Sequence, residues 1–283
     1  MPRMTTIALL GTGLLGAGMV ENLLAKGHRV QVWNRTTAKL APLVQRGAIA
    51  AETPADCVRG AARVHLVLAE DAAVDAVIAA ARPGLGADVP VIDHSTNLPA
   101  KVKARVAALR GSGVRYVPAP VFMSPQNARE ASGLMLLAGP ASERDTLQAE
   151  LSSMTGKLLW VGDRADLAAV YKLAGNSLFF ALAAAMADVL AIGAGNGVDA
   201  ATMLALFDTF KPGSALPFLG QRVAAAGGGP ASFELSMARK DARLMQEAAG
   251  AQRLLVLPAV AAAMDRALQA GHGQADYAVF TKA

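Results

Sequence analysis

Residues 7–16 read Ile-Ala-Leu-Leu-Gly-Thr-Gly-Leu-Leu-Gly, an apolar run that breaks into three spaced glycines. The run predicts a buried strand, and the G-x-G-x-x-G spacing predicts a turn from that strand into a helix. Gly11 permits the tight turn, Gly13 lets the backbone approach a pyrophosphate, and Gly16 lets helix and strand pack closely. A helix N-terminus also offers free N–H groups to phosphates. The segment therefore predicts a dinucleotide-binding turn, with cofactor contacts from Gly11, Thr12, Gly13, Leu14, Leu15 and Gly16.

The first half of the chain alternates short apolar runs with helical patterns. The predicted strands are residues 6–10, 29–33, 64–68, 89–93, 115–118, 133–138 and 157–161, and helices such as 15–26 and 72–81 lie between them. Alternation of this kind is typical of βαβ units in an α/β fold. We expect a Rossmann domain with a doubly wound, mostly parallel sheet over residues 1–163.

The character of the chain changes after about residue 165. Residues 167–194 form one long helical pattern, and further helices are predicted at 199–210, 216–226, 236–250 and 257–270. Gly- and Pro-containing breakers separate these patterns, and the segment shows no strand signal. We expect an all-helical domain over residues 164–283 that contributes to substrate binding and oligomerisation.

The composition excludes several classes of function. The 283 residues are 53% hydrophobic and only 17% charged, with a formal net charge of +5 and 5% aromatic residues. With neither a Lys/Arg run nor an aromatic stacking platform, nucleic-acid binding is not expected. The single cysteine, Cys57, rules out an intrachain disulfide, and no metal-ligand cluster is seen, so no metal is expected.

Membrane insertion and secretion are not expected either. The apolar stretch near the N-terminus mimics a signal peptide, but glycines interrupt it and Glu21 follows. The long apolar helix contains Lys172, Asn176 and Asp188, which breaks any uninterrupted span. We expect a soluble cytoplasmic protein.

The end of the second strand selects between the two nicotinamide cofactors. An acidic residue there binds the 2′-hydroxyl of NAD, but this chain has Asn34, followed by Arg35 and Thr36. A guanidinium at that place suits a 2′-phosphate, to which Thr36 and Lys39 can add donors. The segment predicts NADP (NADPH), with NAD less favoured; the alternative is that Arg35 is an ordinary solvated turn residue.

Lys172 and Asn176 stand four residues apart early in the long helix, so they share one helix face. Their neighbours are apolar, and a lysine in apolar surroundings tends toward a lowered pKa, which suits proton transfer. The alternative, weighed equally on periodicity alone, is a lysine that extends from a helix edge to solvent.

Four ordered motifs resemble the β-hydroxyacid dehydrogenases, which include 3-hydroxyisobutyrate dehydrogenase and glyoxylate/succinic semialdehyde reductases. Residues 11–36 match the family's opening almost position by position, and residues 93–99, D-H-S-T-N-L-P, resemble its D-x-S-T-x-x-P loop. Lys172 and Asn176 match its K-x-x-x-N helix, and residues 233–241 resemble its F-x-x-x-x-x-x-K-D motif. The resemblance covers nearly the whole chain, including a C-terminal domain like that of 6-phosphogluconate dehydrogenase.

The resemblance implies a role for each motif. Lys172 would be the general acid or base, and Asn176 would orient the substrate. Ser95 and Thr96 would lie by the nicotinamide and its ribose, Ser95 also facing the substrate. Lys240 would reach the cofactor side of the cleft, whereas Asp241 is expected to cap or pair within its helix. Independently, Leu68 and Ala69 end a parallel strand, where ligands bind, so we expect them to line the cofactor.

The predicted substrate loop departs from the family pattern. The family usually has A-P-V-S-G-G, but here Ala119 and Pro120 are followed by Val121, Phe122, Met123 and Ser124. The two large side chains would make the pocket more apolar, and Ser124 is a candidate for a displaced donor. Two smaller departures are Arg164, which is either an anion contact or a surface residue, and Asp188, which replaces a common Glu and is expected to be structural.

These observations predict an NADP-dependent oxidoreductase that transfers hydride between the nicotinamide and a small-molecule substrate of hydroxy-acid, aldehyde or keto-acid type. The apolar loop points away from a small hydroxy acid. An imine reductase with an apolar cleft is the alternative enzyme class, which the substrate loop favours and Lys172 disfavours. A non-catalytic NADP-binding scaffold is the third hypothesis, which the presence of Lys172 and Asn176 disfavours. The apolar helical half and the resemblance together predict a homodimer or homotetramer.

Overall fold

The computed structural model describes residues 5–225 and 228–282. The chain divides into two compact units, Met1–Asn176 and Ser177–Ala283. The sequence placed the division after residue 163, in the connection that precedes the long helix, and that functional boundary stays a prediction.

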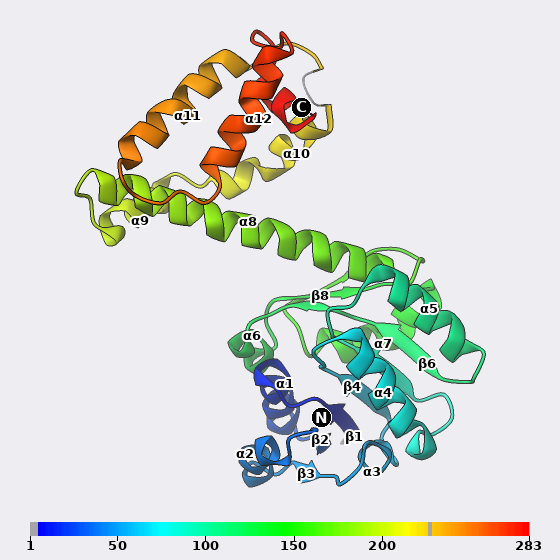
Figure 1. Cartoon of the computed structure of the whole chain (residues 1–283). Helices are drawn as coiled ribbons and strands as arrows, with labels where there is room; N and C mark the ends of the chain where they lie inside the picture. Colours follow the sequence, from blue (N-terminus) through cyan, green and yellow to red (C-terminus); the bar gives the residue numbers. More distant parts are fainter. Residues whose placement is uncertain (1–4, 226–227, 283) are drawn as a thin grey trace. The chain divides into compact units, whose positions relative to one another are not determined.

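Six parallel strands form the main sheet of the first unit, in the order β3-β2-β1-β4-β5-β6 (Figure 1). Their bounds are β1 (Thr6–Leu10), β2 (Arg29–Trp33), β3 (Ile49–Ala50), β4 (Arg63–Leu66), β5 (Pro90–Asp93) and β6 (Arg115–Pro118). This is the doubly wound order, in which the strands are added in one direction from β1 to β3 and in the other from β4 to β6. Ligands bind at the carboxyl ends of the strands where that order reverses, between β1 and β4. The α/β prediction is confirmed, although the short β3 escaped it.

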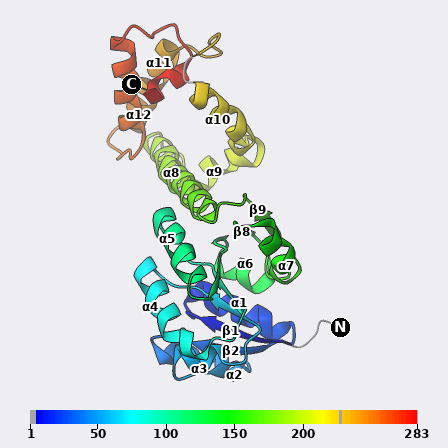
Figure 2. The ribbon, with the colours of Figure 1, turned by 90° about the vertical axis from the view of Figure 1, so that its right-hand side faces the viewer.

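Helices cover both faces of this sheet because successive strand residues point to opposite sides. Ile7 and Leu9 pack in one cluster, whereas Ala8 and Leu10 pack in another. The first face carries α1 (Leu14–Ala25), α2 (Ala41–Gln45), which follows the short turn η1 (Thr37–Leu40), and α7 (Ala141–Ser152). The second face carries α3 (Pro54–Val58), α4 (Asp71–Ala81), η2 (Arg82–Gly84) and α5 (Pro99–Arg110), of which Figure 2 shows α4 and α5 side by side.

A separate three-stranded sheet follows, in the order β7-β8-β9. It contains β7 (Val121–Phe122), β8 (Leu134–Leu137) and β9 (Lys157–Trp160), and the helix α6 (Pro125–Glu130) connects β7 to β8. Strands β7 and β8 are antiparallel, whereas β8 and β9 are parallel. The sequence predicted β8 and β9 but not β7, because two residues are too few to show an alternating pattern. It also gave no sign that these strands leave the main sheet.

The remaining chain is helical, as predicted. The elements are α8 (Leu167–Gly195), α9 (Ala200–Thr209), η3 (Pro212–Ala215), α10 (Leu216–Ala225), α11 (Leu235–Ala249), α12 (Leu257–Gln269) and η4 (Tyr277–Lys282). The core of the second unit is formed by α11, α12 and η4. Position 226, predicted as the end of the helix 216–226, lies outside the described residues.

Helix α8 has the length and composition of a membrane-crossing helix, with a mean hydropathy of 2.0 over its most apolar window. Only 11% of that window is buried. Phe179 and Phe180 are more than two-thirds exposed, at 69% and 68%. Exposure of so much apolar surface indicates a face that another surface covers.

Candidate functional site

The glycine turn follows β1 and has the backbone geometry that its sequence predicts. Gly11 has φ of +100°, and a Cβ there would lie 2.1 Å from the Val67 carbonyl oxygen. A Cβ on Gly16 would lie 2.0 Å from the Gly11 carbonyl oxygen, so only glycine lets α1 start this close to β1. A Cβ on Gly13 would meet nothing within 4 Å. The middle glycine therefore faces open space that a ligand can approach.

The same turn contains polar groups suited to a phosphate. Thr12 is 3% exposed, and its Oγ1 has no hydrogen-bond partner within the described chain. Helix α1 begins after Gly13 with no side-chain cap, which leaves N–H groups of its first turn available. Leu15 packs into the core, whereas Leu14 is exposed. An orphaned buried hydroxyl beside an uncapped helix start fits the pyrophosphate of a dinucleotide.

Asn34 and Arg35 take different places at the end of β2. The Asn34 Oδ1 accepts a hydrogen bond from the Thr12 N–H at 3.0 Å, and its Nδ2 donates to the Thr36 carbonyl at 3.0 Å. Asn34 thus braces the glycine turn. Arg35 and Lys39 are exposed, and no side-chain bond of Arg35 is found in the described part of the chain. The guanidinium is therefore free to meet an anion.

Ser95 connects the carboxyl ends of two neighbouring parallel strands. Its Oγ accepts a hydrogen bond from the Leu68 N–H at 2.9 Å, and its own N–H donates to Asp93 Oδ1 at 2.9 Å. The other oxygen of Asp93 accepts bonds from the Tyr116 hydroxyl at 2.6 Å and the Asn97 amide at 2.8 Å. Asp93 therefore fixes the loop in which Ser95 stands, and both Thr96 and Ala69 are exposed beside it.

A buried chain of imidazoles supports the start of the substrate loop, and sequence reasoning missed it. Arg63 Nε donates to His65 Nε2 at 3.1 Å, so His65 donates from Nδ1 to His94 Nε2, 2.9 Å away. His94 then donates from Nδ1 to the Ala119 carbonyl at 2.7 Å. Burial lowers the pKa of both histidines, and their mutual proximity lowers that of His65 further. The only sequence signal was His94 inside the D-x-S-T-like motif.

The substrate loop presents apolar side chains rather than free donors. Val121 is buried at 3% exposure, and Met123 packs against the core. Ser124 caps α6: its Oγ accepts from the Asn127 N–H at 3.1 Å, and its own N–H donates to Asn127 Oδ1 at 2.9 Å. The Phe122 ring is half-buried and faces α8.

Lys172 and Asn176 meet on the first turns of α8, where the residue spacing places them. The Lys172 Nζ donates to Asn176 Oδ1 at 2.9 Å and lies 4.2 Å from the centroid of the Phe122 ring. Burial lowers the pKa of Lys172. An ammonium with a weakened hold on its proton, aimed by an amide, can give that proton to a neighbouring oxygen.

Two further predicted positions lie in other surroundings. Lys240 forms an ion pair with Asp241 at 2.9 Å on α11, in the second unit. Arg164 pairs with Asp166 at 2.9 Å and is largely exposed. Asp188 accepts three backbone N–H bonds from residues 255–257, at the start of α12, which gives it a structural role.

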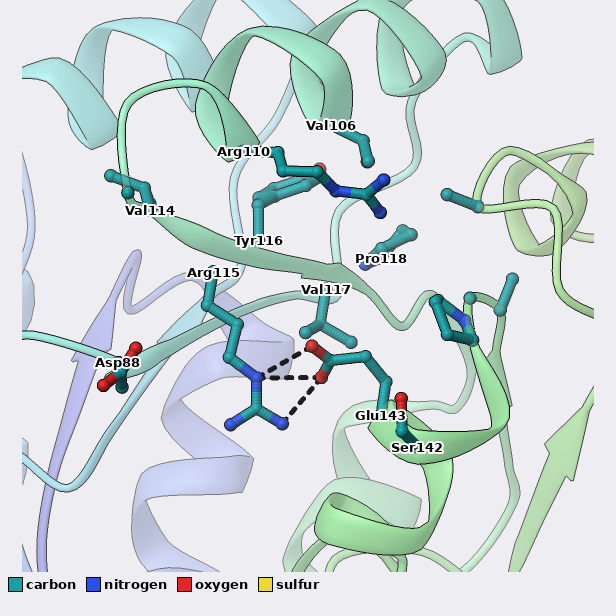
Figure 3. A pocket seen from close by; sticks show the side chains of 15 residues that line it. Asp88, Val106, Arg110, Val114, Arg115, Tyr116, Val117, Pro118, Ser142 and Glu143 are labelled. Carbon is teal, nitrogen blue, oxygen red and sulfur yellow. Dashed lines mark hydrogen bonds and ion pairs between the residues drawn. The ribbon is translucent and has the colours of Figure 1, made fainter.

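A pocket of about 320 Å³ lies elsewhere in the first unit, beside the edge strand β6 (Figure 3). Arg115 and Glu143 face each other across it, with N–O distances of 2.7–2.9 Å, so their charges satisfy one another. None of the predicted site residues lines this pocket. The residues that the sequence predicts to carry the chemistry lie instead at the glycine turn, the end of β2, the loop after β5 and the start of α8. No cluster of three or more metal-ligating side chains is found within residues 5–225 and 228–282.

Comparison with known proteins shows that the chain is similar to dehydrogenases. Residues 6–162 match the model of the NAD-binding domain of 6-phosphogluconate dehydrogenase. The 3-hydroxyisobutyrate dehydrogenase of Pseudomonas aeruginosa is 32% identical over 204 residues, which are 71% of this chain and 68% of that protein. The chain belongs to the β-hydroxyacid dehydrogenase family.

Membership in the β-hydroxyacid dehydrogenase family confirms the predicted resemblance and the prediction of an enzyme. Glyoxylate/succinic semialdehyde reductase 1 of Arabidopsis thaliana is 26% identical and aligns over 98% of this chain and 97% of that one. The imine reductase from Myxococcus stipitatus in complex with NADP+ has a TM-score of 0.86 at 21% identity, covering 98% of this chain and 99% of that chain. That likeness shows the shared fold. Because of its family, the chain is an NAD(P)-dependent oxidoreductase that acts on a small molecule.

Proposed function

We propose that this enzyme uses NADPH to reduce a carbonyl carbon, or NADP+ to oxidise the corresponding alcohol, with Lys172 as the general acid or base. The bound nicotinamide supplies or accepts the hydride. The observation that carries the proposal is the half-buried Lys172, which donates to Asn176 at 2.9 Å and whose pKa burial lowers. Ser95 and Thr96 follow β5 at the carboxyl end of the parallel sheet. Leu68 and Ala69 follow β4 at the same edge, because β4 ends at Leu66 rather than at residue 68 as the sequence predicted, and the Leu68 N–H donates to Ser95.

The role of Lys172 is tested by replacing it with methionine, which keeps the apolar stem and removes the ammonium. Lys172→Met should lower kcat by 10²-fold or more, about the contribution of a positioned acid, while NADPH binding persists. Exposed Lys211→Ala serves as the control. Because the acid must be protonated, carbonyl reduction should decline as pH rises through the lowered pKa of Lys172. Near-normal turnover in Lys172→Met would contradict the mechanism.

The choice of NADP over NAD rests on the exposed Arg35 and on the absence of a carboxylate beside it. Charge-assisted bonds to a 2′-phosphate contribute about 1.5–3 kcal/mol, so Arg35→Ala should weaken NADPH binding about 10- to 150-fold. NADH binding should change little. Arg29→Ala, at the opposite end of β2, is the matched control. Equal weakening of both cofactors by Arg35→Ala would contradict the assignment, and calorimetric titration measures each affinity.

A second candidate function is imine reduction, which the apolar substrate loop favours. Phe122 covers the lysine, Met123 is packed, and the Ser124 hydroxyl is engaged in its cap, so this loop offers little to a substrate carboxylate. A panel of small aldehydes, keto acids and cyclic imines, followed by NADPH absorbance, separates the two functions. Turnover of imines alone would support imine reduction over carbonyl reduction. Silence across the panel despite tight NADPH binding would favour a non-catalytic scaffold.

We also propose that the enzyme is a cytoplasmic homodimer or homotetramer without a membrane partner. Burial raises the pKa of the Cys57 thiol to about 12, and the chain has no other cysteine to form a disulfide with it. The exposed phenyl rings of Phe179 and Phe180 would be covered by a second copy. Replacing both with glutamate should give a monomer in sedimentation analysis, whereas membrane association of the wild type would contradict the proposal.

A further inference from the structure

The Phe122 side chain of the substrate loop lies against one face of α8. Ala168, Lys172 and Gly175 are spaced by four and three residues, so they share that face. The Phe122 ring packs against the cluster that contains the fully buried Ala168. Its centroid lies 4.2 Å from the Lys172 Nζ. The ring therefore covers α8 at Lys172 and also one turn earlier, at Ala168.

Gly175 accommodates the far edge of the same ring. A Cβ at this position would lie 2.4 Å from Phe122 Cζ and 2.8 Å from Cε1. No side chain fits there without moving the ring. Glycine inside a helix is less favourable than alanine, so α8 carries a poor helix former at the position that the ring requires.

The ring cannot readily withdraw, because its backbone is part of the second sheet. Phe122 pairs with Leu134 of β8, and the preceding Val121 pairs with Met135. Both Val121 and Met135 are buried, at 3% and 0% exposure. The ladder holds the ring at a fixed height over α8.

We infer that Phe122 is a positioning residue for Lys172, and that Gly175 serves to admit its phenyl ring. The face of the ring attracts the ammonium, and the Asn176 amide accepts one of its protons. With these two sides engaged, the remaining N–H bonds of Lys172 have a restricted set of directions in which to meet a substrate oxygen. The catalytic consequence rests on the proposed function, but the contact can be tested without any activity.

The first test measures the ionisation of Lys172 directly. Competitive acetylation across a pH series, read by mass spectrometry, gives the pKa of this amine even in an inactive protein. The ring favours the ammonium and thus opposes the effect of burial. Phe122→Leu should therefore lower the pKa of Lys172 by about half a unit to one unit, and Phe122→Tyr should keep the wild-type value.

The outcome separates this inference from the proposed function. A pKa in Phe122→Leu equal to or above that of the wild type overturns the positioning role, whatever the activity of Lys172→Met. If turnover is present, the pH profile of kcat in Phe122→Leu should shift in the same direction as the labelling pKa. Phe122→Met, a second apolar variant without a ring, serves if Phe122→Leu does not fold.

The second test asks whether Gly175 and Phe122 depend on one another. In the wild type, Gly175→Ala should lower the Tm, because the new Cβ collides with the ring. In the Phe122→Leu background the collision is relieved, and Gly175→Ala should raise the Tm, since alanine is the better helix former. A change of the same sign in both backgrounds overturns the assignment of Gly175.

Discussion

Acidification should destabilise this protein through the buried pair His65 and His94. Their side chains lie in residues that are 0% and 3% exposed, and burial lowers the pKa of each below the ordinary value of 6.5. The charged groups nearby are Arg63, which donates to His65, Asp93, which precedes His94, and Glu150, which pairs with Arg63 at 3.2 Å. The carboxylate of Asp93 partly favours a charged His94, but its oxygens accept other bonds.

The magnitude follows from proton linkage. Below the ordinary pKa of 6.5, the unfolded chain binds a proton at each imidazole and the folded protein does not. The free energy of unfolding therefore falls as pH falls. Between about pH 7.5 and about pH 5.5, each histidine that stays neutral in the fold lowers the free energy of unfolding by about 1.4 kcal/mol, so the pair lowers it by up to about 2.7 kcal/mol.

Urea unfolding at the two pH values, followed by circular dichroism, measures this loss. His65→Gln removes one titrating group, so its pH-dependent loss should be smaller by about 1.4 kcal/mol, even if the variant is less stable throughout. The exposed His272→Gln is the control and should keep the full loss. A wild type equally stable at both pH values, or an undiminished loss in His65→Gln, would refute the reasoning.

Three other substitutions test contacts inside the two units, Gly11 and Tyr116 in the first and Asp188 in the second. Gly11→Ala should lower the free energy of unfolding by about 2 kcal/mol or more, because φ is +100° and the Cβ would lie 2.1 Å from the Val67 carbonyl oxygen. Thermal melts measure this loss of stability, and a titration should show weaker NADPH binding. Asp188→Ala should lower the free energy of unfolding by about 2–4 kcal/mol, because it removes the acceptor of three backbone N–H bonds at the start of α12. Burial raises the pKa of Asp188 but those donors lower it more, so the contribution should fade only as pH drops below the ordinary value of 3.8. Tyr116→Phe should cost about 1–3 kcal/mol, because Asp93 loses a 2.6 Å bond while buried; urea midpoints measure both losses.

Most helices and strands were predictable, because each depends on a local pattern of residues in the sequence. Apolar runs and glycine spacing located β1, the turn at Gly11 and the start of α1, and helical periodicity located α8 with Lys172 and Asn176 on one face. The two-residue strands β3 and β7 were not predictable, since two residues show no alternating pattern and only the partner strands β2 and β8 define them. The exit of β8 and β9 from the main sheet has the same cause.

The sequence by itself determined the doubly wound fold, the glycine turn and the family, because each depends on residue types at fixed local spacing. Only the tertiary structure decided how the polar groups are used. Asn34 accepts a hydrogen bond from the Thr12 N–H, His65 and His94 form a buried chain to Ala119, and Phe122 lies against Lys172 and Gly175. Each of these contacts joins segments between 22 and 53 positions apart, and such pairings arise from packing rather than from local pattern.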